Sequence, residues 1–307
     1  MSWSLYLLTF KLKSPLHIGF HKVANLSRTR AYIPARTFWG ALTAKLTRKL
    51  KSSNYREVGE FLKNTIRFGY FYISDGNNIF IPKYTDEGLK FGELPQVEFE
   101  KRFIRSFIST SVEPYSLTAE EGTLHEIEFI SSYELGREDE EPKPVFIKGV
   151  LWVSELLESR LKIHTDENDF SIFNNEKYIK FSDLVNKLQI GGERRYGFGQ
   201  IEIYNIERIH DQNLGNTGFK GIWKEYNNEI ELELKENDFI WSHVKFSSDL
   251  EIKGSIEPLV GRDWSDKGAG RELRFHGFCW TPGSILVKSN TFKVTKNFGL
   301  WEQSSLH

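Results

Sequence analysis

The chain has 307 residues, of which 39% are hydrophobic and 27% charged, with a net charge of −1 and a single cysteine. This composition excludes a chain that is disordered throughout, and one cysteine can form neither an internal disulfide nor a zinc-binding cluster. The apolar stretch at residues 1–10 is too short to span a bilayer and has no basic leader, so we expect a soluble, cytoplasmic protein without a cofactor, a metal site or a membrane contact.

The first half of the sequence predicts strands and a helix. Apolar side chains alternate over residues 4–13, which indicates an opening strand. After Pro34, an apolar residue recurs at every fourth position from 38 to 50, which predicts an amphipathic helix. Residues 68–73 and 79–82 flank a polar turn and predict a hairpin. Residues 86–96 are predicted to be a loop.

Two more strands are predicted at residues 124–128 and 145–153. Residues 154–163 and 182–188 have helical composition. At residues 200–208, isoleucines alternate imperfectly with polar residues, which predicts a further strand.

A composition change predicts two domains. Residues 211–221 are rich in Asn, Gly and Asp, so we place the boundary there, between a domain at residues 1–210 and a smaller, β-rich domain at residues 222–307. Strands are predicted in the second domain at residues 228–234, 240–246 and 284–288. Residues 262–274 are dense in charge and glycine and are predicted to be a loop, either solvated or in contact with RNA or a protein neighbour.

The charge is distributed unevenly along the chain. Residues 1–56 contain eleven basic residues and no Asp or Glu, a charge of +11, so the remainder sums to −12 (30 basic minus 42 acidic). Such asymmetry predicts a surface that faces a polyanion. The alternative is that these cations pair with carboxylates elsewhere in the fold. The RNA-binding residues predicted in or beside this segment are Lys22, Arg28, Arg30, Arg36 and Lys45.

Residues 191–199 carry the sharpest local pattern, four glycines with two arginines and two aromatic residues. Glycine permits positive φ and close approach, so N–H groups can meet phosphate oxygens, while aromatic rings can stack on bases. One alternative is a structural turn into a strand; another is a mononucleotide loop, but no Gly-Lys-Ser or Gly-Lys-Thr follows. The RNA-binding residues predicted here are Gly191, Gly192, Arg194, Arg195, Tyr196, Gly197, Phe198 and Gly199.

This loop resembles the glycine-rich signature of the repeat-associated mysterious protein (RAMP) superfamily, the RRM-like RNA-binding subunits of CRISPR effectors. Residues 14–19, 32–42 and 111–128 resemble the family's opening strand exit, its Tyr-Ile-Pro-Gly-Ser segment and its mid-domain segment, with Ala35 and Arg36 in place of the Gly-Ser. The resemblance implies an α+β fold with an RRM-like, ferredoxin-like RAMP domain, followed by a smaller β-rich domain of related or degenerate RRM-like design.

The resemblance also implies a role. Cleaving backbone subunits of type III complexes carry an Asp in the segment that corresponds to residues 20–31, which here contains no carboxylate, so we expect no catalytic residue. Residues 254–262 and 279–284 resemble the second half of the capping subunits that hold the 5′ tag of the guide RNA. We therefore predict a non-catalytic capping subunit that binds the guide RNA (crRNA), meets target RNA only indirectly, and joins the large polymerase-like subunit and the backbone RAMP subunits.

Two alternatives stay open. A backbone subunit that lines the guide–target duplex would be present in several copies. A guide-processing endoribonuclease would use His17 and His21 as general base and acid, although His17 stands in an apolar context where a packed strand-end residue is more common.

Overall fold

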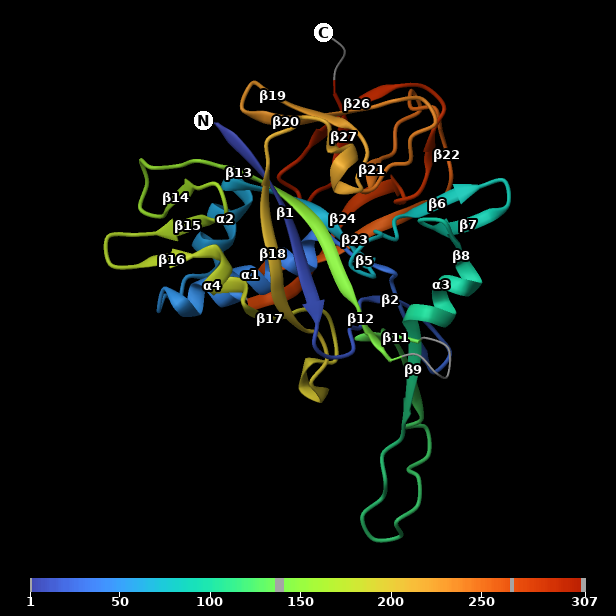
Figure 1. Ribbon diagram of the computed structural model, residues 1–307. Coiled ribbons are helices and arrows are strands. Elements are labelled where there is room, and N and C mark those ends of the chain that lie inside the picture. The colour runs from blue at the N-terminus through green and yellow to red at the C-terminus, as the bar shows by residue number, and fades with distance from the viewer. Residues whose placement is uncertain (1, 136–140, 266–267, 305–307) are drawn as a thin grey trace.

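Two β-sheets dominate the computed structural model, which describes residues 2–135, 141–265 and 268–304 (Figure 1). Neighbouring strands of the first sheet are all antiparallel. In spatial order, this sheet consists of β17 (Lys187–Gln189), β18 (Gln200–Ile209), β1 (Trp3–Leu12), β13 (Phe146–Ser154), β5 (Ile66–Ser74) and β4 (Tyr32–Ile33). The second sheet consists of β19 (Ile222–Tyr226), β20 (Glu229–Leu234), β26 (Asn290–Val294), β27 (Trp301–Gln303), β21 (Val244–Lys245), β24 (Gly268–Trp280) and β23 (Ile256–Ser265).

Short strands form smaller sheets around these two. One sheet contains β2 (Gly19–Val23), β3 (Leu26–Thr29), β10 (His125–Ile130) and β9 (Ile104–Ser109). Two others contain β6 (Pro82–Thr85), β7 (Gly88–Phe91) and β8 (Leu94–Pro95), and β14 (Lys162–Thr165), β15 (Phe170–Phe173) and β16 (Tyr178–Lys180). The remaining pairs are β11 (Tyr133–Glu134) with β12 (Lys143–Pro144), and β22 (Ile252–Lys253) with β25 (Ile285–Leu286).

The helices are few, so the fold is strand-rich α+β. They are α1 (Ala35–Lys49), α2 (Tyr55–Thr65), α3 (Gln96–Phe103) and α4 (Phe181–Val185), with 3₁₀ turns η1 (Arg194–Tyr196) and η2 (Leu214–Thr217). α1 is confirmed where its apolar period predicts it, and Phe38 on this helix packs 5.5 Å from Phe10 of β1, ring centre to ring centre. The sequence analysis missed α2, although Asn54 caps it by accepting a hydrogen bond from the Glu57 N–H. No helix in the described ranges is both long and apolar enough to cross a membrane.

The two large sheets share one hydrophobic core. α1, α2 and α4 lie on one face of the first sheet (Figure 1). On the other face, Trp152 of β13 stacks on Trp241, with 6.2 Å between ring centres, and the Tyr72 hydroxyl donates to the Trp241 carbonyl. The first sheet ends at Ile209 and the second begins at Ile222, but because the core runs across both, the division into two domains stays a prediction.

An extended arm projects from this body between β9 and β10 (Figure 1). Its side chains are largely solvated, with Tyr115 97% and Leu117 78% exposed. The arm therefore contributes little to the core.

Several sequence predictions of secondary structure are wrong. Residues 154–163 form no helix: Leu156 and Ile163 pair as an isolated β-bridge, and β14 begins at Lys162. The predicted loop at residues 86–96 contains β7 and β8, and the helix at residues 182–188 is only the short α4, with β17 after it. The hairpin at residues 68–82 is reduced to one bridge between Ser74 and Ile79.

The second sheet departs most from prediction. β20 confirms the strand at residues 228–234, but only Val244–Lys245 and Ile285–Leu286 are strands in the other two predicted segments. Residues 262–274 are the end of a two-stranded ribbon of β23 and β24, not a loop. The tip of this ribbon, residues 266–267, lies outside the described residues.

Candidate nucleic-acid interface

A groove between α1, β17 and the glycine-rich loop is lined mostly by cationic side chains. We call it the basic groove, and it has a volume of about 830 Å³. Six cationic side chains and one carboxylate line it, namely Lys13, Lys45, Arg48, Lys187, Arg194, Arg195 and Glu202. Lys13 neutralises Glu202 at 3.0 Å, so the remaining five cations give the groove a strongly positive character. Such a groove favours a polyanionic chain.

The glycines of the loop are required by its own packing. Gly191 and Gly199 have φ of +78° and +79°, and a Cβ on Gly199 would lie 1.8 Å from the Ile190 carbonyl oxygen. The Gly192 N–H donates to the His17 carbonyl at 2.8 Å, and the Gly199 N–H donates to the Pro15 carbonyl at 2.7 Å. These N–H groups are therefore used inside the protein, where they fasten the loop to the segment after β1. Gly197 differs, because a Cβ there would meet nothing within 4 Å.

The charged and aromatic side chains of the loop divide into two groups. Arg194, Arg195 and Tyr196 form the turn η1 and are exposed, Tyr196 to 70%. Phe198 is half-buried and its ring packs edge-on against Phe129, 5.5 Å away. η1 is thus the part of the loop that can meet a ligand, while Phe198 helps to hold it.

A second cavity continues from the basic groove. We call it the junction cavity; it has a volume of about 790 Å³ and shares Ala41, Ala44, Gln189 and Arg194 with the basic groove. Gly191, Gly192, Arg30 and Arg36 also line it. Its far wall comes from the second sheet, through residues of β23 and β24.

Arg30 lies in the wall of the junction cavity and pairs with a carboxylate of the second sheet. Its Nη1 lies 2.9 Å from Glu257 of β23, and both side chains are less than a fifth exposed. Glu257 also lies 2.6 Å from Nε2 of His243, and the Tyr70 hydroxyl lies 2.7 Å from Nδ1 of the same ring. Burial lowers the pKa of His243, so the ring is held neutral beside this ion pair.

Arg36 is held in the same way, further along the ribbon. Its Nη1 lies 2.5 Å from Asp263, its Nη2 lies 2.6 Å from Nε2 of His276, and its guanidinium covers the Phe298 ring at 4.0 Å. Burial lowers the pKa of Arg36, although Asp263 opposes that shift. Arg30 and Arg36 therefore fasten the first sheet to the second, which matches the alternative in which N-terminal cations pair with distant carboxylates.

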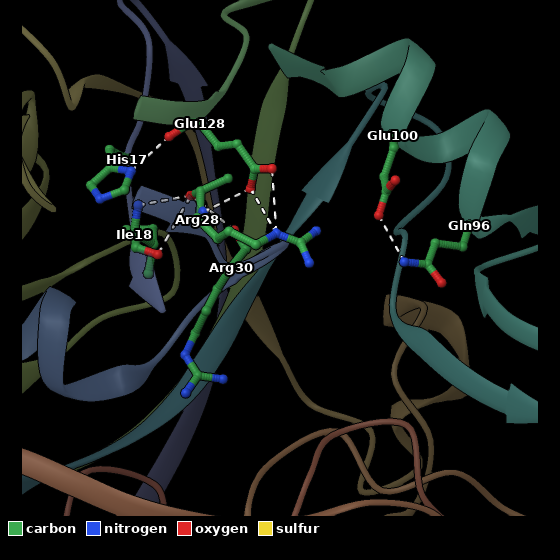
Figure 2. A network of polar contacts seen from close by, with 8 residues as sticks. His17, Ile18, Arg28, Arg30, Gln96, Glu100 and Glu128 are labelled. Atoms are coloured by element: carbon green, nitrogen blue, oxygen red, sulfur yellow. Dashed lines mark hydrogen bonds and ion pairs between the residues drawn. The ribbon is translucent and has the colours of Figure 1, made fainter. Parts of the chain in front are cut away.

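The segment between β1 and β4 is fixed by Glu128 of β10 (Figure 2). Its carboxylate accepts from Nε of Arg28 at 3.3 Å and from the Thr29 N–H at 3.1 Å. Its backbone carbonyl lies 2.6 Å from Nδ1 of His17, whose side chain is buried. Arg28 is thus paired, and His17 has a structural position.

The predicted site residues are only partly brought together. Lys45, Arg194 and Arg195 meet in the basic groove, and Gly191 and Gly192 reach the junction cavity. The lining of neither cavity includes the following: Lys22, Arg28, Tyr196, Gly197, Phe198 and Gly199. Lys22 is exposed on β2.

Sequence reasoning missed Lys13, Arg48 and Lys187, which line the basic groove. Arg48 could have been predicted from the sequence, because it lies three residues after Lys45 and so shares a face of α1 with it. In the described ranges, no group of three or more His, Cys, Asp or Glu side chains is arranged to hold a metal ion.

A comparison with models of known protein families identifies the family of this chain. Residues 9–202, more than half of the chain, match the RAMP superfamily. The chain belongs to the RAMP superfamily. The match includes α1 and the glycine-rich loop of this RAMP chain, whereas residues 203–307, with the second sheet, lie beyond it. A comparison with curated proteins finds no match.

Two solved chains share the fold of this RAMP chain over its length. One, in a cryo-EM structure of the type III-B Cmr-beta bound to cognate target RNA and AMPPnP, has a TM-score of 0.53 at 12% identity and covers 97% of this chain and 99% of its own. Another, in Cmr-beta bound to cognate target RNA, has a TM-score of 0.50 at 13% identity, with the same coverage. At such low identity, the likeness shows a common strand-rich α+β fold that includes the second sheet.

Proposed function

We propose that this RAMP chain is a non-catalytic subunit of a CRISPR type III effector that binds and positions the 5′ tag of the guide RNA in the cytoplasm. The observation that carries the proposal is the basic groove, because five cations that Glu202 does not neutralise line this one groove beside the glycine-rich loop. Phosphates would meet these cations, and bases would meet Tyr196, which is 70% exposed at the loop's turn.

The family and the fold support an effector subunit. RAMP membership covers the groove, and the two similar chains come from type III-B Cmr-beta complexes bound to target RNA. Their likeness extends over the second sheet, as a capping subunit with a large C-terminal part requires. The neighbours that we propose are the large polymerase-like subunit and the first backbone subunit.

The strand order supports an RRM-like first unit. Its four strands in chain order are β1, β5, β13 and β18, and their order across the sheet is β18, β1, β13, β5. α1 and α2 lie between β1 and β5 in the chain, and α4 lies before β18. This is the connectivity of a split βαβ fold. We propose that the second sheet is a degenerate unit of related design.

A holding role is favoured over a cutting role by two features. Residues 20–31 contain no carboxylate that could bind a metal or act as a base. His17 is only 6% exposed, and its Nδ1 is engaged by the Glu128 carbonyl, so it is poorly placed to take a proton from RNA. Incubation of the pure protein with labelled precursor guide RNA should give no product. A product that disappears in His17→Ala would establish the endoribonuclease alternative instead.

The salt dependence of RNA binding tests the groove. Arg194→Ala with Arg195→Ala should weaken binding of tagged guide RNA and reduce the slope of log K against log salt by about 1.4, since each phosphate contact on a single strand contributes about 0.7. Fluorescence anisotropy at four salt concentrations measures this slope. The control is Arg160→Ala with Lys288→Ala, an equal charge change at side chains 83% and 70% exposed outside the groove. Equal slopes for the two variants would contradict the proposal.

Copy number separates the capping role from the backbone role. Native mass spectrometry of the assembled effector should find one copy of this chain per guide RNA. Several copies would favour a backbone subunit that lines the guide–target duplex. Saturable binding of a mononucleotide with no preference for longer RNA would favour a small-molecule binder.

A further inference from the structure

The ribbon of β23 and β24 has two chemically different faces. In its register Val260 pairs with Phe275, and Arg262 pairs with Leu273. Because side chains alternate along a strand, these residues share one face. Asp263 and Glu272, which pair with each other in the register, share the opposite face; Asp263 pairs with Arg36 there, and a Cβ on Gly261 would lie 2.4 Å from the Arg36 guanidinium carbon.

The face that points away from Arg36 is apolar and open to solvent. Six side chains follow it, and we call them the apolar strip: Phe246 (48% exposed), Ile256 (42%), Val260 (54%), Leu273 (65%), Phe275 (58%) and Phe278 (58%). The register places Val260 opposite Phe275 and Ile256 opposite Trp280, the Phe275 ring lies 5.6 Å from that of Phe278, and Phe246 extends the row by packing on Trp280 at 5.9 Å. Single exposed apolar residues are ordinary, but a contiguous strip marks an interaction surface.

Positive charge borders the strip. Arg262 and Arg271 are exposed on the same face, and neither makes an ion pair within the part of the chain that the structure describes. Two carboxylates of the described part of the ribbon lie on its other face, where Asp263 pairs with Arg36 and Glu272 lies 3.8 Å from Arg274. The surface therefore complements an apolar patch flanked by Asp or Glu.

The side chains of the strip indicate which kind of molecule would bind there. Half of it is aliphatic, and Ile, Val and Leu offer no ring on which a base could stack, which disfavours single-stranded RNA. A second copy of this chain is disfavoured by charge, because a two-fold contact through the strip would bring Arg262 and Arg271 against their own copies. A different protein with carboxylates around an apolar centre meets neither difficulty.

We propose that the apolar strip is the docking surface for a protein neighbour in the effector complex, one whose contact surface has an apolar centre flanked by Asp or Glu. The identity of the candidate neighbours rests on the proposed function, which names the large polymerase-like and backbone subunits. Leu273 and Phe275 form the centre of the contact, and Arg262 and Arg271 form its rim.

Protein and RNA would bind at separate surfaces. No residue of the strip lines the basic groove, which lies beside α1, β17 and the glycine-rich loop. Val260 is the one strip residue that also lines the junction cavity, where Arg36 meets Asp263 and His276. A neighbour on the strip would therefore hold the ribbon against Arg36 and leave the groove open. Loss of protein docking and loss of RNA binding should accordingly be separable.

Pairwise binding of purified full-length subunits tests the strip. Leu273→Ser with Phe275→Ser should weaken the affinity for one of the two subunits at least tenfold, measured by analytical ultracentrifugation, and change guide-RNA affinity less than twofold. The matched control is Leu157→Ser with Tyr178→Ser, since those side chains are 49% and 60% exposed elsewhere. This control should bind both subunits normally.

A second pair of variants tests the rim without altering apolar packing. Arg262→Gln with Arg271→Gln should slow association with the same subunit and reduce its salt dependence. Unchanged binding in both variant pairs, or a wild-type chain that binds neither subunit, overturns the docking surface even if RNA binding is intact. If the wild-type chain is a dimer that dissociates in the serine variant, the strip binds a second copy of the chain. If the serine variant loses only affinity for RNA, the strip binds nucleic acid. Either result overturns the proposal. Failure of the proposed function would instead appear as absence of guide-RNA binding in the wild type.

Discussion

Replacing Gly199 with alanine should cost far more stability than the same change at Gly197. Both residues have positive φ, +79° and +85°, so alanine carries a backbone cost of about 1–2 kcal/mol at each position. At Gly199 the new Cβ would also lie 1.8 Å from the Ile190 carbonyl oxygen, a distance that no rotamer change can relieve. The strand end must therefore move.

That movement breaks two hydrogen bonds. The Ile190 N–H donates to the Gly199 carbonyl at 2.9 Å, and the Gly199 N–H donates to the Pro15 carbonyl at 2.7 Å. Each contributes about 1 kcal/mol, so Gly199→Ala should lower the free energy of unfolding by about 3–4 kcal/mol. Gly197→Ala meets no atom within 4 Å and should cost only the backbone term.

Urea denaturation followed by fluorescence measures both variants under the same conditions. The expected difference in unfolding free energy between them is about 2 kcal/mol. Equal losses would refute the conclusion that Gly199 is required by internal packing. They would favour glycines retained for approach to a ligand instead.

Three further predictions concern the buried groups. Asp263→Ala leaves the largely buried Arg36 without its carboxylate and should lower the free energy of unfolding by about 1–3 kcal/mol in urea denaturation, whereas the more exposed Glu272→Ala should change it by less than about 0.5 kcal/mol. Burial lowers the pKa of His243 below its usual 6.5, so the folded state binds fewer protons than the unfolded state. The contribution of this group to stability should therefore be complete above about pH 6.5 and be lost as the pH falls below it. The thermal midpoint of His243→Gln should accordingly depend less on pH than that of the wild type. Burial raises the pKa of the Cys279 thiol to about 12, so a disulfide reagent at pH 8 should label it only after unfolding, and rapid labelling of the native protein would contradict its buried position.

Local periodicity was enough to predict the central elements. β1 and α1 have one buried and one less buried face, so their apolar side chains recur at periods of two and about four. The glycine-rich loop was also visible, because its residues are adjacent in the chain. What its glycines do was not visible, since Gly199 contacts Pro15 and Ile190 only after the sheet forms.

Contacts between distant residues could not be predicted. Arg36 is 227 residues from Asp263, so nothing in the N-terminal sequence indicates that this cation is already paired. The ribbon at residues 262–274 was predicted as a loop for a related reason. Residues 271–275 are all exposed, and the two apolar side chains among them, Leu273 and Phe275, make too short an alternation among charged residues to distinguish a strand from a loop.

The pairing of the two sheets has a consequence for where RNA can lie. An RRM-type sheet uses its open face, through exposed aromatic side chains, to stack bases. Here Trp152 and Tyr72 occupy that face, but Trp241 and Phe219 pack directly on them, with Tyr72 and Trp152 fully buried. Bases cannot reach these rings without separating the two sheets. The cations of the basic groove include residues of α1, β17 and η1, and no residue of the second sheet lines this groove in the described part of the chain. Under the proposed function, the second sheet therefore covers the face that an RRM-type sheet would use, and the basic groove is the place where RNA would be held.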